Sequence, residues 1–157
     1  MAIPPYIAVV GPGDATDTER ADAEAIGTKL ATAGAVIVTG GLGGVMAAAS
    51  RGAATTGGTT LGILPGTDRR AANEWVTVAI PTGLGELRNG LVVRAADALI
   101  AVGGAYGTLS EVALALKTGT PVIGLGTWAI DGIERADSAS DAAARALDRS
   151  GRAPHLH

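Results

Sequence analysis

The sequence contains no cysteine and no phenylalanine, and its two histidines, His155 and His157, stand at the C-terminus. Without cysteine the chain has neither disulfide bonds nor thiolate metal sites. Histidines confined to the last residues argue against a histidine-based catalytic triad, and nothing else in the sequence leads us to expect a bound metal. No cluster of basic residues exceeds the pair Arg69-Arg70, and the net charge is −3. The basic stripe that nucleic-acid binding requires is therefore missing.

Long apolar runs are missing as well. No run approaches the ~20 residues of a membrane span, and the N-terminus lacks the basic and apolar regions of a signal peptide. We therefore expect a cytoplasmic protein with neither membrane nor nucleic acid as a partner. Apolar residues make up 47% of the 157 residues, enough for one domain with a substantial core. We place this domain at residues 1–150 and a frayed tail at 151–157.

Glycine, in contrast, is abundant: 24 residues, about twice the usual share of ~7%, most of them directly after short apolar runs. The runs predict strands at Tyr6–Val10, Val36–Val38, Thr59–Leu64, Val76–Ile80, Ala98–Val102 and Pro121–Leu125. The continuous apolar run Tyr6–Val10 has the pattern of a strand buried on both faces. Helical spacing predicts helices at Thr18–Ala33, Val45–Thr56, Gly85–Ala96, around Leu109–Leu116 and at Ser140–Arg149. The alternation predicts a single-domain, Rossmann-like α/β fold, with a mostly parallel sheet and helices on both faces.

Local patterns refine this prediction. Thr16 and Glu19 have the spacing of a capping box at the start of the first helix. In the predicted helix Gly85–Ala96, Leu87, Leu91 and Val92 are expected to face the core. The polar stretch Thr67–Glu74 is expected to be a mobile loop, and Ser138 to cap the last helix.

Three glycine loops follow predicted strands: Gly11–Gly13, Gly40–Gly44 and Gly103–Gly107. Such loops can converge at the carboxyl edge of a parallel sheet, where ligands bind at the topological switch point. A loop that leads into a helix also directs free N–H groups toward an anion, although glycines serve tight turns equally well. Gly11-Pro-Gly13 lacks the third glycine of the dinucleotide fingerprint, and neither of the other loops continues into the Lys-Ser/Thr of a P-loop.

The chemistry-bearing candidates near these loops each allow two interpretations. Glu111 has capping-box spacing from Thr108 and would then bond back to the Thr108 N–H; alternatively it points into the crevice as a base or cation stabiliser. Arg88 is either an exposed side chain or a guanidinium that holds phosphate or orients a carboxylate. Tyr106 is a lid, a stacking surface or a plain loop residue, and Met46 belongs to the core or touches a base.

Two segments carry a family resemblance. Gly103-Gly-Ala-Tyr-Gly-Thr-Leu-Ser-Glu111 resembles the PGGxGTxxE signature of the Lonely Guy (LOG) family, also called lysine decarboxylase-like. Thr39-Gly-Gly-Leu-Gly-Gly-Val-Met46 resembles its second signature, GGGxxGLM. The spacing from Arg88 to Glu111 matches the family's catalytic arginine and glutamate. The GGxGT form without proline, together with Arg88-Asn89, is more similar to the bacterial subgroup that includes the molybdenum cofactor carrier proteins.

The resemblance implies a Rossmann-like homodimer, or a larger homo-oligomer, that hydrolyses the N-glycosidic bond of a nucleoside 5′-monophosphate to free base and ribose 5-phosphate. Arg88 and Glu111 would then be catalytic, and no cofactor would be needed. The implied ligand-binding residues are Gly11, Gly41, Gly43, Gly44, Met46, Asn89, Gly104, Ala105, Tyr106, Gly107 and Thr108. The alternative is a non-catalytic carrier that binds the molybdenum cofactor or a related pterin phosphate, or a nucleotide sensor.

Three departures from the LOG signatures bear on this choice. Gly103 replaces the signature proline and is expected to loosen the loop. Ala105 replaces a glycine, at a cost of about 1 kcal/mol if the position needs positive φ. Asn89 replaces a lysine and so removes a positive charge near the bound anion.

Overall fold

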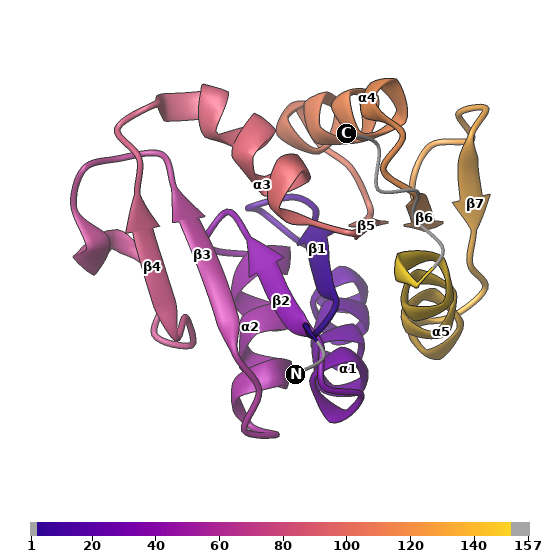
Figure 1. Ribbon diagram of the computed structural model, residues 1–157, viewed down its shortest axis with the longest axis horizontal. Helices are drawn as coiled ribbons and strands as arrows, with labels where there is room; N and C mark the ends of the chain where they lie inside the picture. Colours follow the sequence, from indigo (N-terminus) through magenta and orange to yellow (C-terminus); the bar gives the residue numbers. More distant parts are fainter. Residues whose placement is uncertain (1–2, 152–157) are drawn as a thin grey trace.

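Every predicted strand forms, and all strands of the sheet run parallel in the computed structural model, which describes residues 3–151 (Figure 1). The strands are β1 Tyr6–Val10, β2 Val36–Thr39, β3 Thr60–Leu64, β4 Val78–Pro81, β5 Ala98–Val102, β6 Val122–Leu125 and β7 Ile133–Arg135. Their order in the seven-stranded sheet is β4-β3-β2-β1-β5-β6-β7. At its centre, Ile7 of β1 pairs with Ile37 of β2 on one side and with Ala98 of β5 on the other.

Helices cover both faces of this sheet, as predicted (Figure 1). They are α1 Asp17–Thr32, α2 Val45–Ala54, α3 Asn89–Ala95, α4 Tyr106–Thr118 and α5 Ala139–Ser150, with the 3-10 turns η1 Arg69–Ala71 and η2 Gly85–Arg88. One core cluster joins α1, α2 and α5 to the sheet and includes Ile26, Val45 and Ala142. The other joins α3 and α4 to the opposite face and includes Val92 and Val112. The fold class expected from the sequence is thus confirmed.

Two local expectations are confirmed. In the capping box of α1, the Thr16 N–H donates to Glu19 Oε1 at 2.9 Å, and the Glu19 N–H donates to Thr16 Oγ1 at 3.1 Å. Ser138 caps α5 by accepting from the Asp141 N–H at 3.0 Å. A third expectation, the loop at Thr67–Glu74, needs refining because this stretch contains the turn η1.

The expected inward positions of Leu87 and Leu91 are wrong. The predicted helix Gly85–Ala96 divides into η2 and α3. A 3-10 turn has three residues per turn rather than 3.6, so the helical register assumed for this segment does not hold. Leu87 is 79% exposed and Leu91 42%, whereas Val92 is buried as expected.

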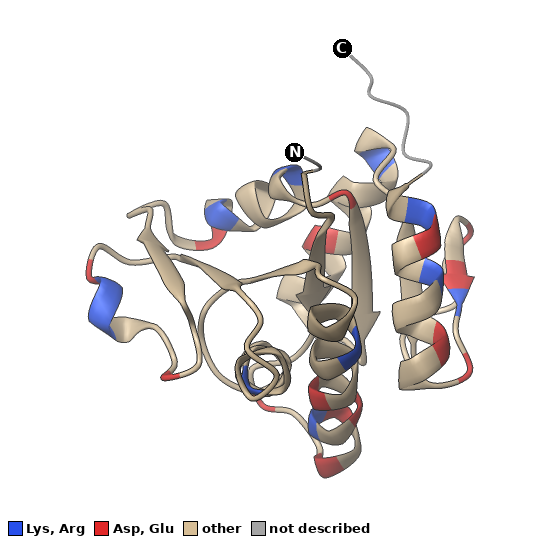
Figure 2. Cartoon of the chain, turned by 60° about the horizontal axis from the view of Figure 1, so that its bottom comes forward, with Lys and Arg blue, Asp and Glu red and all other residues tan. Residues whose placement is uncertain are grey.

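Strand β7, which the sequence analysis missed, closes one edge of the sheet. It pairs with β6 through only three positions, among them Val122 with Ile133. Ion pairs fasten it to α5: Arg145 Nη1 and Arg149 Nε each lie 2.8 Å from a carboxylate oxygen of Glu134. Acidic and basic positions accordingly alternate along α5 and β7 in Figure 2.

Glycines allow α1 and α2 to pack with their backbones close together. A Cβ atom on Gly52 would overlap the carbonyl oxygen of Glu24, and one on Gly27 would overlap that of Ala49. These are backbone atoms of packed helices, which cannot turn aside as a flexible side chain can.

We therefore expect Gly52→Ala to lower the free energy of unfolding by about 1–3 kcal/mol, the usual cost of overpacking. Urea unfolding followed by circular dichroism measures this change. Gly66→Ala is the matched control, because a Cβ atom there meets nothing within 4 Å. A Gly52→Ala protein as stable as the Gly66→Ala protein would contradict the close-packing argument.

Between residues 3 and 151, no helix is both long enough and apolar enough to cross a membrane. Gly151 follows the end of α5. The remainder of the predicted tail, with His155 and His157, lies outside the described residues.

Candidate functional site

The loops after β1, β2 and β5 converge at the carboxyl edge of the sheet. From β1 the chain adds β2, β3 and β4 on one side of the sheet and then β5, β6 and β7 on the other side. The direction therefore reverses between β1 and β5, which is the topological switch point. The loops enclose a cavity of about 170 Å³, which we call the α4 cavity. It is lined by Val10, Gly11, Pro12, Gly13, Gly40, Met46, Arg88, Asn89, Ala105, Gly107, Thr108 and Glu111.

The α4 cavity brings together eight of the residues singled out from the sequence. They are Gly11, Met46, Arg88, Asn89, Ala105, Gly107, Thr108 and Glu111. Four further lining residues, Val10, Pro12, Gly13 and Gly40, were not assigned to the site. Pro12, Gly13 and Gly40 belong to loops that the sequence analysis had marked, so their position after a strand was the available signal.

Five other candidates do not line this cavity. Gly41 and Gly44 shape the loop after β2, with φ of 78° and 64°. A Cβ atom on Gly41 would press on Leu64, and Gly43 is exposed in the same loop.

The other two candidates outside the cavity belong to the loop after β5. Gly104 packs against the indole ring of Trp128. Tyr106 is 92% exposed.

Glu111 does not form the capping box that its spacing from Thr108 suggested. Helix α4 begins at Tyr106, with Ala105 as N-cap and no side-chain cap, so Thr108 already lies within the first turn. Glu111 is instead buried, 7% exposed, and lines the cavity. Burial raises the pKa of Glu111 to about 7, and the charge of Arg88 opposes this shift. Near neutral pH the carboxyl group is therefore divided between its protonated and ionised forms.

Arg88 is buried and bound by backbone oxygens. Its Nε donates to the Ile63 carbonyl at 2.9 Å and its Nη2 to the Gly40 carbonyl at 3.5 Å, while Nη1 donates to Asn89 Oδ1. Burial lowers the pKa of Arg88, against the opposing charges of Glu111 and Glu86. The guanidinium thus joins the ends of β2 and β3 and is not an exposed surface group.

Asn89 extends this network to α4, because its Nδ2 donates to Ser110 Oγ at 3.1 Å. Asn89 therefore holds α3 and α4 together at the floor of the cavity, in the position where the LOG signature has lysine.

Ala105 causes no backbone strain: the position does not need positive φ, so the cost that depended on that condition does not arise. Its φ of −139° and ψ of 179° are extended angles that any residue adopts. Gly103 has φ +62°, which proline cannot reach because its ring holds φ near −65°. The turn into α4 therefore differs from one that begins with the signature proline.

The start of α4 has unfilled hydrogen-bonding capacity. The first N–H groups of a helix lack intrahelical partners, and among residues 3–151 the N-cap Ala105 supplies no side-chain cap to them. Thr108 Oγ1 is buried and has no hydrogen-bond partner within the described residues. An uncapped helix N-terminus beside a buried hydroxyl group is suited to bind an anionic group such as phosphate.

The fold and this cavity define a class: a Rossmann-like α/β protein with a ligand cavity at the switch point of its sheet. Residues 4–150 match the SLOG cluster4 family, and the chain belongs to that family. The family relationship predicted from the two glycine signatures is thus confirmed.

Individual relatives agree with this assignment. The chain is 42% identical over 119 residues to an uncharacterized protein of Archaeoglobus fulgidus, covering 76% of this chain and 78% of that protein. Its structure is similar to that of the molybdenum cofactor binding protein from Rippkaea orientalis, with a TM-score of 0.88, 38% identity and coverage of 97% and 99% of the two chains. The Moco carrier protein from Chlamydomonas reinhardtii gives a TM-score of 0.87 at 36% identity, covering 96% and 99%.

Proposed function

We propose that this protein is a carrier that binds a phosphorylated pterin of the molybdenum cofactor type, with the phosphate held at the start of α4. The observation that carries the proposal is the buried hydroxyl group of Thr108, which has no partner in the described part of the chain, beside the uncapped helix end. An unsatisfied buried polar group costs about 1–3 kcal/mol. A phosphate oxygen would satisfy both this hydroxyl group and the free N–H groups of the helix.

Two further observations favour binding over catalysis. Structures that cover nearly the whole chain belong to a molybdenum cofactor binding protein and a Moco carrier protein. The guanidinium of Arg88 is occupied by carbonyl oxygens and by Asn89, so it is fixed as part of the framework. A carrier needs this framework and the anion site, but no reactive group.

Hydrolysis of a nucleoside 5′-monophosphate is the second candidate, because Arg88 and Glu111 line the same cavity. Breaking an N-glycosidic bond builds positive charge on the ribose, and a nearby carboxylate stabilises that charge. A Glu111 carboxyl group with a pKa of about 7 is ionised in only part of the molecules at neutral pH, which weakens this interpretation.

We also propose the homo-oligomer implied by the resemblance. The exposed side chains of Leu87 and Leu91 are suited to an interface between copies of the chain.

Calorimetric titration distinguishes the two functions when combined with chromatographic product analysis. We expect pterin monophosphate to bind one molecule per chain, inorganic phosphate to compete with it, and no base to be released from AMP, GMP, CMP or N6-prenylated AMP. Release of base by the wild-type protein, lost in both Arg88→Ala and Glu111→Gln variants, would instead establish the hydrolase.

A further inference from the structure

The α4 cavity is too small for the whole of the proposed ligand. Its volume of about 170 Å³ lies below the ~300–1,000 Å³ typical of sites that enclose a small molecule. It has room for a phosphate group but not for a fused ring system as well. The ring of a ligand whose phosphate lies at the start of α4 must therefore occupy a neighbouring space.

Two larger cavities follow along the sheet, on the side of β6 and β7. One, of about 310 Å³, is lined by Gly103, Gly104, Gly126, Thr127 and Trp128. The other, of about 760 Å³, lies around the loop between β6 and β7 and also includes Thr127 and Trp128. Parallel strands are about 4.8 Å apart, so the ends of β5 and β6 are close enough for one ligand to reach both. We call these two cavities together the Trp128 cleft.

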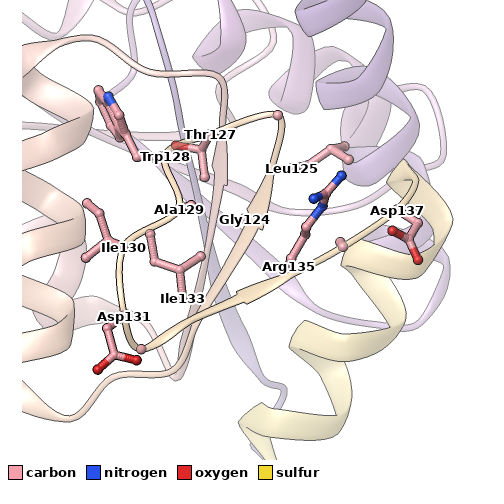
Figure 3. A pocket seen from close by; sticks show the side chains of 13 residues that line it. Gly124, Leu125, Thr127, Trp128, Ala129, Ile130, Asp131, Ile133, Arg135 and Asp137 are labelled. Atoms are coloured by element: carbon pink, nitrogen blue, oxygen red, sulfur yellow. The ribbon is translucent and has the colours of Figure 1, made fainter.

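The path of the chain between β6 and β7 explains why the cleft exists. Parallel neighbours normally require a crossover of a dozen or more residues, usually containing a helix that covers the sheet. Here β6 ends at Leu125 and β7 begins at Ile133, so only the short loop Gly126–Gly132 connects them. With a loop in place of a helix, space remains between the loop and the strands. Figure 3 shows the loop arching past Ala129 and Ile130 beside the strand that carries Ile133 and Arg135.

Trp128 lies where the cleft meets the loop that leads into α4. A Cβ atom on Gly104 would lie only 2.7 Å from Cζ3 of Trp128, so the indole rests directly on the backbone of that loop. The side chain remains 38% exposed. An indole that rests on backbone, lines a cavity and remains partly exposed can stack with a planar ring.

The loop between β6 and β7, which carries Trp128, has a second unfilled hydrogen-bonding group. Thr127 Oγ1 is buried and has no partner among residues 3–151, and Thr127 lines both parts of the cleft. Its hydroxyl group can donate to, or accept from, the nitrogen and oxygen atoms at the edge of a heterocycle.

We propose that the Trp128 cleft binds the planar heterocyclic ring of the ligand, stacked on the Trp128 indole with the Thr127 hydroxyl group at the ring edge. This inference rests on the proposed function, which places the phosphate of the same ligand at the start of α4. Trp128 is then the residue that selects ligands with a fused ring, while the helix end selects the phosphate.

Tryptophan fluorescence tests the cleft directly, because the chain has only two tryptophans. Trp75 packs beneath Arg51 and lines neither part of the cleft. In a Trp75→Phe protein, emission therefore reports Trp128 alone. We expect unphosphorylated pterin and pterin monophosphate to quench this emission saturably, and inorganic phosphate to leave it unchanged.

Binding measurements on the otherwise wild-type chain complete the test. Trp128→Ala is expected to weaken pterin monophosphate binding roughly 5- to 100-fold, the effect of losing one ring stack, and to leave inorganic phosphate binding unchanged. Trp128→Phe retains an aromatic ring and is expected to restore most of the affinity. Trp75→Phe, the matched control, is expected to bind as the wild type does.

The outcomes separate this inference from the proposed function. One outcome is that pterin monophosphate binds with an affinity that depends on Thr108, while Trp128→Ala leaves this affinity unchanged and the ligand leaves Trp128 emission unchanged. The cleft is then not the ring site and the inference is overturned. If phosphate compounds fail to bind while unphosphorylated pterin still quenches Trp128, the phosphate site is refuted and the ring site stands. If neither pterin changes Trp128 emission, the inference is overturned.

Discussion

Thr108→Val is expected to weaken binding of pterin monophosphate by about 10- to 100-fold, while raising the stability of the ligand-free protein. A hydrogen bond to a charged group contributes about 1.5–3 kcal/mol, which corresponds to this loss of affinity. Valine has nearly the same shape as threonine and leaves no unpartnered hydroxyl group in the buried position. The free energy of unfolding without ligand should therefore rise by about 1 kcal/mol.

Calorimetry and urea unfolding measure these two opposite effects. Thr118→Val is the matched control in the same helix, because Thr118 Oγ1 already donates to the Leu114 carbonyl at 2.8 Å. That variant should bind the ligand as the wild type does. Equal affinity of the Thr108→Val and wild-type proteins for pterin monophosphate would contradict the carrier proposal, because the Thr108 hydroxyl group would then not bind the phosphate.

Glu111→Gln is expected to make the protein more stable than the wild type above pH 7, by about 3 kcal/mol. Burial raises the pKa of Glu111 from 4.5 to about 7, so the folded protein holds this proton more tightly than the unfolded chain. The contribution of Glu111 to the free energy of unfolding is therefore fully present below pH 4.5 and is lost as the pH rises toward 7. Above pH 7 the wild type stays at this lower stability. A pKa change of this size corresponds to about 3 kcal/mol.

Urea unfolding of both proteins at several pH values between 5 and 8 tests this expectation, because other titrating groups cancel in the difference. Glu86→Gln, which removes an exposed carboxylate near Arg88, is the control and should follow the wild type. The ionised Glu111 also repels an anionic ligand, so affinity should fall above pH 7 in the wild type but not in Glu111→Gln. A difference in stability that does not depend on pH would refute the raised pKa.

The sheet was predictable wherever strands are buried on both faces. Tyr6–Val10 and Ala98–Val102 were predicted with the bounds that the structure has, because each is a continuous apolar run that a glycine ends. Strand β7 was not predictable, since Ile133–Arg135 has only three residues and two of them are charged. Its pairing with β6 and the Glu134 ion pairs hold it in the sheet, and these contacts lie outside the strand's own sequence pattern.

The site was predictable in its residues but not in its geometry. The glycine signatures and the Arg88–Glu111 spacing identified most of the residues that line the α4 cavity. The start of α4 was misplaced, because the capping-box pattern at Thr108 competes with a helix that begins two residues earlier, at Tyr106. Trp128 was not predictable as a site residue, since a tryptophan in a loop has no local pattern and acquires its position only by packing on Gly104.

The central position of β1 also has a consequence for the synthesis of the protein. The backbone N–H of Tyr6, at the start of β1, donates to the carboxylate of Asp97, 91 residues later. At a ribosomal rate of about 5–20 residues per second, roughly 5–20 s pass between the synthesis of β1 and that of β5, its second neighbour in the sheet. The β1–β4 half emerges first with one side of β1 unpaired, so the nascent chain exposes an apolar strand edge until β5 arrives.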